Sequence, residues 1–147
     1  MESSNPARVL VVAHRTAATG ALSDAIKRRA SAGPARFTLL VPRSAHGLHR
    51  VTDPEEQDES EAQGVLDAAL PLLSRAAGSP VDGLIGDPSP LTAIEDAINS
   101  QPFEEIILST LPARVSRWLR LDLPSKVGGL GLPLTIVTPA EQESAAI

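Results

Sequence analysis

The chain has 147 residues, 42% of them apolar, which fits one globular domain with a substantial core. Its net charge of −5 and its 2% of aromatic residues argue against a nucleic-acid-binding surface, which is usually basic and often stacks bases on aromatic rings. The absence of cysteine excludes disulfides, thiolate metal sites and thiol nucleophiles. Because we find no apolar run long enough to span a membrane and no secretion signal, we expect a cytoplasmic protein.

Five short apolar runs, each bounded by turn residues, predict five buried strands. Runs that lack a polar residue at every second position are typical of parallel strands covered on both faces. The expected strands span 8–13, 36–41, 81–85, 106–108 and Leu134–Val137.

Apolar residues at helical spacing predict helices between these strands. Thr16 or Thr19 can cap a helix that ends near residue 30. Ser89 followed by Pro90 fits the start of another helix, because proline is favoured in a first turn.

The region between the second and third strands is predicted to form the longest helix. It starts with six carboxylates at 53–61, which fit solvated first turns or, alternatively, a patch that binds a partner. Pro71 lies inside the apolar stripe of this helix and should kink or interrupt it.

Strands and helices therefore alternate along the chain. Such alternation predicts an α/β fold with a doubly wound, Rossmann-like parallel sheet and helices on both faces. We expect a single domain over residues 1–147, with loose tails at 1–7 and 139–147.

The loops after the strands supply candidate ligand-binding residues, because ligands of open α/β sheets bind at the carboxyl ends of the strands. The loop after the fourth strand is the richest, with a hydroxyl pair, three arginines at three-residue spacing and the only tryptophan. The candidate ligand-binding residues are His14, Arg15, Gly86, Asp87, Ser109, Thr110, Arg114 and Arg117. We find no P-loop, dinucleotide or nucleophile motif, so we predict no catalytic residue and favour a protein that is not an enzyme.

The arginines and the tryptophan of that loop each allow two interpretations. The arginines could hold a phosphate, together with Arg15, through forked hydrogen bonds. Alternatively they are exposed, some of them paired with Asp122, Glu104 or Glu105. Trp118 could stack on a base, or it could anchor the packing of the leucines around it.

The three histidines of the chain follow the first two predicted strands. His14 comes after the first strand, and His46 and His49 come after the second, so they could meet and bind a zinc ion. Since no carboxylate ligand lies at a metal-motif spacing, we predict no metal and keep the three histidines as the alternative.

Three stretches resemble the universal stress protein family. They are the opening strand RVLVVA, the strand, glycine turn and helix of LIGDPSPLTAIEDAI, and the ending EEIILSTLPARVSRWLRLDLPSKVGGLGLPLTIV. The ending looks like the family's strand, phosphate loop, helix and final strand. The resemblance implies a five-stranded sheet in the order 3-2-1-4-5, adenine-nucleotide binding in some members, and dimers formed through the last strand.

The chain departs from the family where nucleotide-binding members hold phosphate. Their loop has a glycine, two residues, a second glycine, nine residues, and a third glycine followed by Ser or Thr. Ser109, Pro112 and Asp122 occupy the three glycine positions here, and Pro112 has no N–H to donate. Asp122 is expected to cap the short helix that follows, which would place a carboxylate where phosphate needs to lie. After the first strand, His14 and Arg15 stand where ATP-binding members usually have Asp.

We therefore predict a universal-stress-like regulatory or binding protein without a cofactor, and without ATP binding of the family's usual kind. The expected partner is a second copy of the chain, paired through Leu134–Val137. The alternative is a binder, or slow hydrolase, of ATP, AMP or another phosphorylated small molecule at the carboxyl edge of the sheet.

Overall fold

The fold is built on a parallel sheet of five strands in the order β3-β2-β1-β4-β5, as the sequence predicted. It was obtained as a computed structural model, which describes residues 6–43, 54–112 and 116–139. The strands are β1 (Ala7–Val12), β2 (Ala35–Pro42), β3 (Asp82–Gly86), β4 (Glu105–Ser109) and β5 (Leu134–Val137). Every strand begins and ends within one residue of its predicted bounds.

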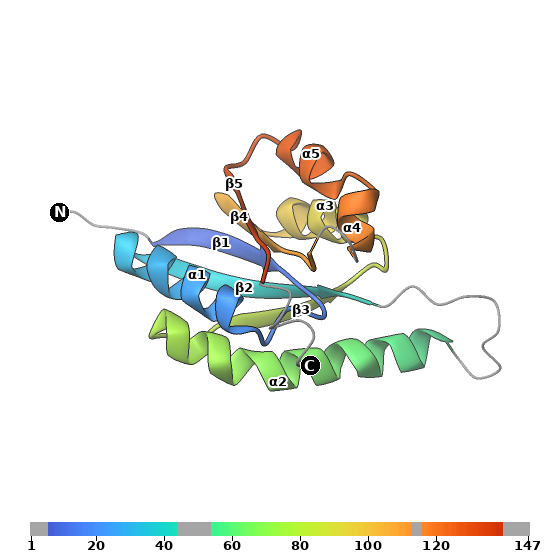
Figure 1. The fold of residues 1–147 in the computed structure, drawn as a ribbon, viewed down its shortest axis with the longest axis horizontal. Helices are drawn as coiled ribbons and strands as arrows, with labels where there is room; N and C mark the ends of the chain where they lie inside the picture. Colours follow the sequence, from blue (N-terminus) through green and yellow to red (C-terminus); the bar gives the residue numbers. More distant parts are fainter. Residues whose placement is uncertain (1–5, 44–53, 113–115, 140–147) are drawn as a thin grey trace.

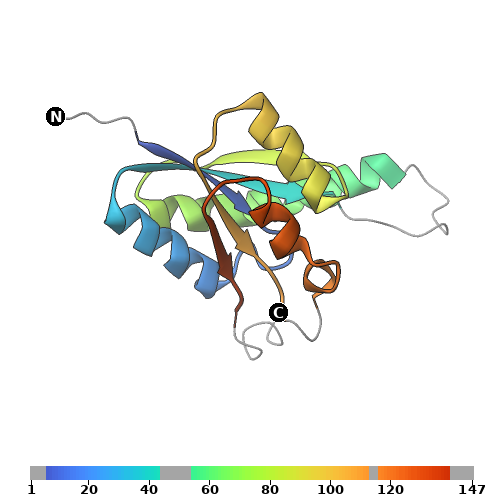
Figure 2. The ribbon, with the colours of Figure 1, turned by 90° about the horizontal axis from the view of Figure 1, so that it is seen from above.

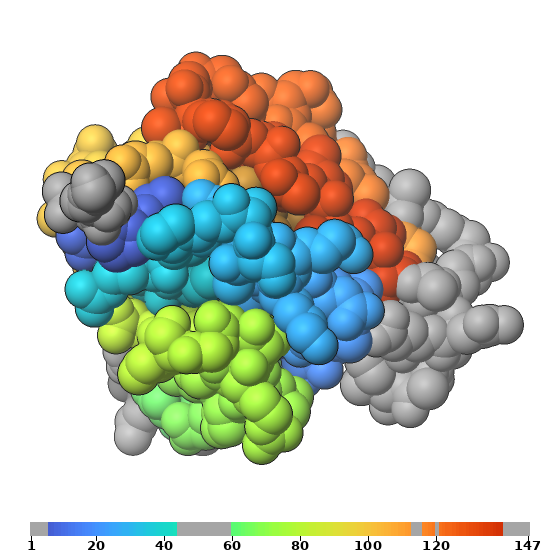
Figure 3. Space-filling model, turned by 90° about the vertical axis from the view of Figure 1, so that its left-hand side faces the viewer, coloured from blue at the N-terminus to red at the C-terminus, as the bar shows by residue number. Residues whose placement is uncertain are grey.

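Helices cover both faces of this sheet (Figure 1). One face carries α1 (Gly20–Ala32) and α2 (Pro54–Ala77), and the other carries α3 (Pro90–Ser100), α4 (Arg117–Arg120) and α5 (Leu123–Gly128). The space-filling view shows α1 between α2 and the last strand (Figure 3). Among the described helices, none combines the length and the apolar composition that a membrane crossing requires.

Two apolar clusters, one on each face, hold the helices to the sheet. Val9 and Val11 of β1 point into the cluster under α1 and α2, and Leu10 and Val12 point into the cluster under α3 and α5. All four side chains are fully buried. This arrangement explains why the strand sequence is continuously apolar, since both of its faces are covered.

The helix starts follow the predicted capping residues. Thr19 precedes α1, and its Oγ1 accepts a hydrogen bond of 3.4 Å from the N–H of Leu22. Ser89 precedes α3 with Pro90 in the first turn, although its side chain makes no capping hydrogen bond. Both positions agree with the sequence, which left Thr16 and Thr19 as alternatives for α1.

Pro71 does not interrupt the long helix, so of the two expected effects, a kink or an interruption, the interruption is wrong. α2 runs from Pro54 to Ala77 as one helix that includes Pro71. The proline ring is exposed, while Leu66, Ala69 and Leu73 are buried against the sheet. We attribute the continuity to this packing, which offsets the hydrogen bond that a proline cannot donate.

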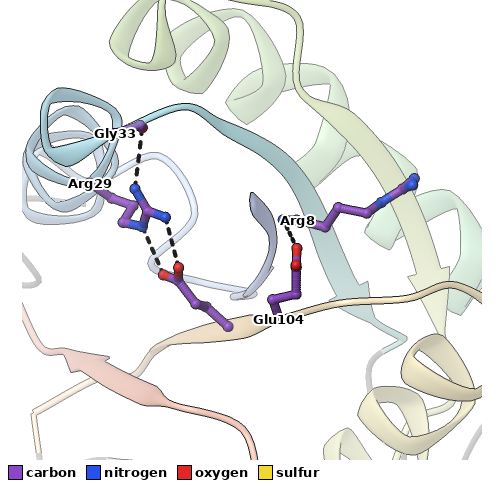
Figure 4. A network of polar contacts seen from close by, with 5 residues as sticks. Arg8, Arg29, Gly33 and Glu104 are labelled. Atoms are coloured by element: carbon purple, nitrogen blue, oxygen red, sulfur yellow. Dashed lines mark hydrogen bonds and ion pairs between the residues drawn. The ribbon is translucent and has the colours of Figure 1, made fainter. Parts of the chain in front are cut away.

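A polar network ties α1 to β4 at the amino end of the sheet (Figure 4). The guanidinium of Arg29 forks onto the carboxylate of Glu105 at 2.8 and 2.7 Å and also donates to the carbonyl oxygen of Gly33. Next to it, Glu104 accepts a hydrogen bond of 2.7 Å from the backbone N–H of Arg8. The hydrogen bonds with Arg29 are the main reason why the pKa of Glu105 lies below its usual value of 4.5.

We expect Arg29→Ala and Glu105→Gln each to lower the free energy of unfolding by about 1 kcal/mol at neutral pH, because a forked, half-buried ion pair is lost. A double-mutant cycle from urea unfolding should show coupling between the two sites. Since the pKa of Glu105 is lowered by folding, its contribution is complete above pH 4.5 and disappears as the pH falls through the folded-state value. Arg28→Ala, on the exposed face of the same helix, is the control; an equal loss there would contradict the assignment.

Gly86 is needed for close packing between β3 and α3. A Cβ atom at this position would lie 2.7 Å from the Cβ of Ala93 and 3.0 Å from Cδ1 of Leu40. We expect Gly86→Ala to destabilise the protein by about 1–3 kcal/mol through overpacking. Gly64→Ala in α2 is the matched control, since nothing lies within 4 Å of its Cβ, and it should stabilise by up to about 1 kcal/mol. If both substitutions change the melting temperature by the same amount in the same direction, the packing role of Gly86 is refuted.

Candidate functional site

A cleft of about 660 Å³ opens at the carboxyl edge of the sheet, between the start of α3 and α4. Figure 1 shows α3 and α4 on the same face of the sheet, and Figure 2 shows that face from above. The strand ends and loops that line it contribute His14, Arg15, Thr16, Pro42, Arg43, Ser109, Thr110 and Leu111. The helix starts contribute Pro88, Ser89, Pro90, Ser116, Arg117, Trp118 and Leu121.

Buried hydroxyl groups belong to the lining of this cleft at the ends of β1 and β4. The hydroxyls of Thr16 and Ser109 lie 2.5 Å apart, and those of Thr110 and Thr138 lie 3.1 Å apart. Thr16, Ser109 and Thr110 are each no more than 2% exposed. These hydrogen bonds join the loop after β1 to the end of β4, and the end of β4 to the residue that follows β5. They therefore hold these segments of the cleft lining in position relative to one another.

The charged groups of the cleft are all basic. Arg15 and Arg117 are exposed and Arg43 is half-buried, and among the described residues that line the cleft there is no carboxylate. The backbone N–H of Arg43 donates to the carbonyl oxygen of Gly86 at 2.9 Å, which fixes this residue at the end of β2. A chain with a net charge of −5 therefore concentrates positive charge in this cleft, which favours an anion there.

His14 adds a neutral imidazole to this surface. Burial lowers its pKa below the usual 6.5; the carboxylate of Glu61 acts in the opposite direction, and Arg15 lowers the pKa further. At neutral pH the ring is therefore uncharged, and it has one nitrogen that donates and one that accepts a hydrogen bond.

Five of the candidate ligand-binding residues come together in the cleft. They are His14, Arg15, Ser109, Thr110 and Arg117. Arg114 lies outside the described residues.

Gly86 and Asp87 do not line the cleft. They belong to a second hollow of about 440 Å³ beside α3, which shares only Arg43 with the cleft. Asp87 accepts a hydrogen bond of 2.8 Å from the N–H of Ser89, so its side chain shapes the turn before α3.

The carboxylates considered as partners of the loop arginines lie elsewhere. Glu105 pairs with Arg29 and Glu104 bonds the backbone of Arg8, both at the opposite end of the sheet. Asp122 is exposed, has left-handed backbone angles (φ 57°) and makes no side-chain capping hydrogen bond to α5. Asp122 therefore precedes α5 at the predicted N-cap position, with Pro124 in the first turn as expected, but the expected capping hydrogen bond of its carboxylate is wrong.

Sequence reasoning overlooked part of the cleft. Thr16 was considered only as a helix cap, and Arg43 was not considered, although it follows the carboxyl end of β2. The short helix α4 was also not predicted; it starts at Ser116, whose Oγ accepts a hydrogen bond of 3.1 Å from the N–H of Leu119. Four residues are too few for a periodic apolar pattern to reveal.

The metal alternative stays a prediction. Within the described ranges no three His, Asp or Glu side chains are close enough together to hold a metal ion. His46 and His49 lie outside the described residues, so their distance to His14 is not defined.

Comparison with known proteins gives matches in structure only. Neither a scan against protein-family models nor a search of curated proteins found a match to the sequence. The fold is similar to a universal stress protein family member from Burkholderia pseudomallei, with 17% identity, a TM-score of 0.62, and coverage of 91% of this chain and 96% of that one.

Two further similar structures contain nucleotides. One is a universal stress protein in complex with cAMP, with 13% identity, a TM-score of 0.62, and coverage of 92% of this chain and 98% of that one. The other is a universal stress protein family protein from Arabidopsis thaliana with AMP bound, with 11% identity, a TM-score of 0.56, and coverage of 94% and 95%.

These similarities extend over nearly the whole of each chain and agree with the strand order of the sheet. The chain therefore has the fold of the universal stress proteins, as its sequence resemblance predicted.

Proposed function

We propose that this protein is a universal-stress-like binding protein that takes a small phosphorylated ligand, of the nucleotide monophosphate class, in the cleft beside β1 and β4. The observation that carries the proposal is the charge of the lining: three arginines and no carboxylate among its described residues. Arginine guanidinium groups suit phosphate because they donate two parallel hydrogen bonds.

The size of the cleft and the structural neighbours support the same class of ligand. A volume of about 660 Å³ lies within the range typical of small-molecule sites. Similar structures contain cAMP and AMP, which makes adenine monophosphates the natural first ligands to test.

A monophosphate fits this chain better than a triphosphate. The loop after β4 has no glycine that would let its backbone close around several phosphates, and Pro112 has no N–H to donate. Arginine side chains can still satisfy a single phosphate without such a loop.

The simplest role for the side chains that line the cleft is to bind a ligand without converting it. The hydroxyls of Thr16 and Ser109 bond each other, and neither has a described carboxylate of the cleft beside it; His14 is the group of the described lining that would suit a general base. A regulatory or sensing function, in which occupancy of the cleft is the signal, follows from this proposal.

Calorimetric titration tests the proposal. We expect AMP to bind with a Kd on the order of micromolar and ATP to bind more weakly. Arg43→Ala and Arg117→Ala should each weaken AMP binding by about tenfold, because a charge-assisted hydrogen bond is lost. Arg28→Ala, an exposed arginine on α1, is the control and should bind as the unmodified protein does. Absence of AMP binding, or an equal effect of all three substitutions, would refute the site.

We also propose that two copies pair through β5. In the described sheet β5 bonds only to β4, which leaves its other edge open, and Ile136 on this strand is 46% exposed. An open, apolar strand edge favours pairing with a second strand.

Light scattering should therefore give the mass of a dimer at micromolar concentration. Ile136→Lys should shift the protein to a monomer, because a charge at an apolar contact is costly to bury. Leu72→Lys is the matched control: Leu72 is 38% exposed on α2, far from the strand edge in sequence and in fold, and its substitution should leave the dimer intact. A monomeric unmodified protein would end this proposal.

A further inference from the structure

The lining of the cleft has an apolar part that the binding of phosphate does not explain. Leu111, Trp118 and Leu121 border the cleft from the segment between β4 and α5. Leu121 is 49% exposed, although large apolar side chains of this chain are mostly buried. An exposed apolar surface inside a basic cleft indicates a ligand with an apolar part as well as a charge.

Trp118 has two environments. It is half-buried, and it packs against the apolar cluster between the sheet and α3 and α5. The same side chain lines the cleft. The two interpretations that the sequence left open for this residue are therefore compatible, since packing fixes the indole while part of it borders the cleft.

The backbone that carries Trp118 is held by hydrogen bonds. Ser116 caps α4 through its buried hydroxyl, which is 2% exposed. At the other end, the N–H of Leu121 donates to the carbonyl oxygen of Arg117 at 3.0 Å, and that of Asp122 donates to Leu119 at 3.1 Å. A side chain on such a turn is ordered before any ligand binds, which reduces the entropy that binding would cost.

The start of α3 supplies rigid apolar residues to the same cleft. Pro88 and Pro90 line it, as Trp118 of α4 does. Prolines and an indole present flat, stiff surfaces that suit a planar ring. An alkyl chain would instead have to lie along a cleft whose remaining lining is arginine, histidine and hydroxyl groups.

We propose that Trp118 determines the specificity of the cleft by stacking on an aromatic ring of the ligand, while Arg15, Arg43 and Arg117 bind its anionic group. This inference rests on the proposed function and adds to it the side chain that meets the ring of the ligand, the indole of Trp118. Stacking on an aromatic side chain contributes about tenfold or more in affinity. The ligand is then an anion that carries a planar ring, rather than any sugar phosphate.

Comparison of AMP with ribose 5-phosphate isolates the ring. By calorimetry, the unmodified protein should bind AMP about tenfold or more tightly than ribose 5-phosphate. Trp118→Leu should abolish this preference and leave the affinity for ribose 5-phosphate unchanged, whereas Trp118→Phe should keep most of the preference. Circular dichroism of each variant establishes that it is folded.

Fluorescence of the unmodified protein provides a second readout that needs no substitution. The chain has a single tryptophan, so its emission reports on Trp118 alone. AMP should quench this emission on binding and ribose 5-phosphate should not. Leu121→Ser, which changes the exposed part of the same wall, should weaken AMP binding more than ribose 5-phosphate binding.

The outcomes separate this inference from the proposed function. Equal binding of AMP and ribose 5-phosphate, or AMP binding without a change in emission, would overturn the role of Trp118 and leave phosphate binding in place. Absence of binding by both ligands would refute the proposed function and the inference together. If Trp118→Leu does not fold, the emission of the unmodified protein and the Leu121→Ser variant decide.

Discussion

The complete burial of β1 is the constraint on which the rest of the structure depends. Its side chains alternate between two apolar clusters, so helices must cover both faces of the sheet. β2 and β4 flank it, and the chain leaves β1 toward α1 on one face and leaves β4 toward α4 and α5 on the other. The loops after β1 and β4 therefore diverge, and the cleft opens where they part, as expected at a switch point of an open α/β sheet.

The strands could be predicted from sequence because their signal is local and strong. A run such as 8–13 contains only apolar residues after its first arginine, which few structures other than a buried strand accommodate. The helices were harder to predict where the preference of a single residue type competes with packing of the whole helix. Proline disfavours the interior of a helix, yet α2 continues through Pro71 because Leu66 and Leu73 on either side of it are buried. Asp122 stands at the predicted N-cap position of α5, but its backbone is left-handed and its side chain makes no capping hydrogen bond.

The candidate site could be predicted only in part, because it combines loops whose relative positions are set by the whole fold. The sequence placed His14, Arg15 and Ser109 at strand ends, and the cleft brings them together. It could not show that Thr16 bonds Ser109, a contact between residues 93 positions apart. Gly86 was read as a ligand-binding glycine of a turn, whereas its small size allows α3 to approach β3.

Positive charge supplied by side chains differs from positive charge supplied by a glycine loop. A glycine loop surrounds phosphate with backbone N–H groups and tolerates little change in position. In the proposed site, Arg15, Arg43 and Arg117 would reach the anion from three different segments of the chain. In this chain the segment after β4 forms α4, which places an indole at the cleft. Under the proposed function, the absence of glycines and the presence of Trp118 belong to one mode of recognition, in which side chains rather than backbone donors contact the ligand.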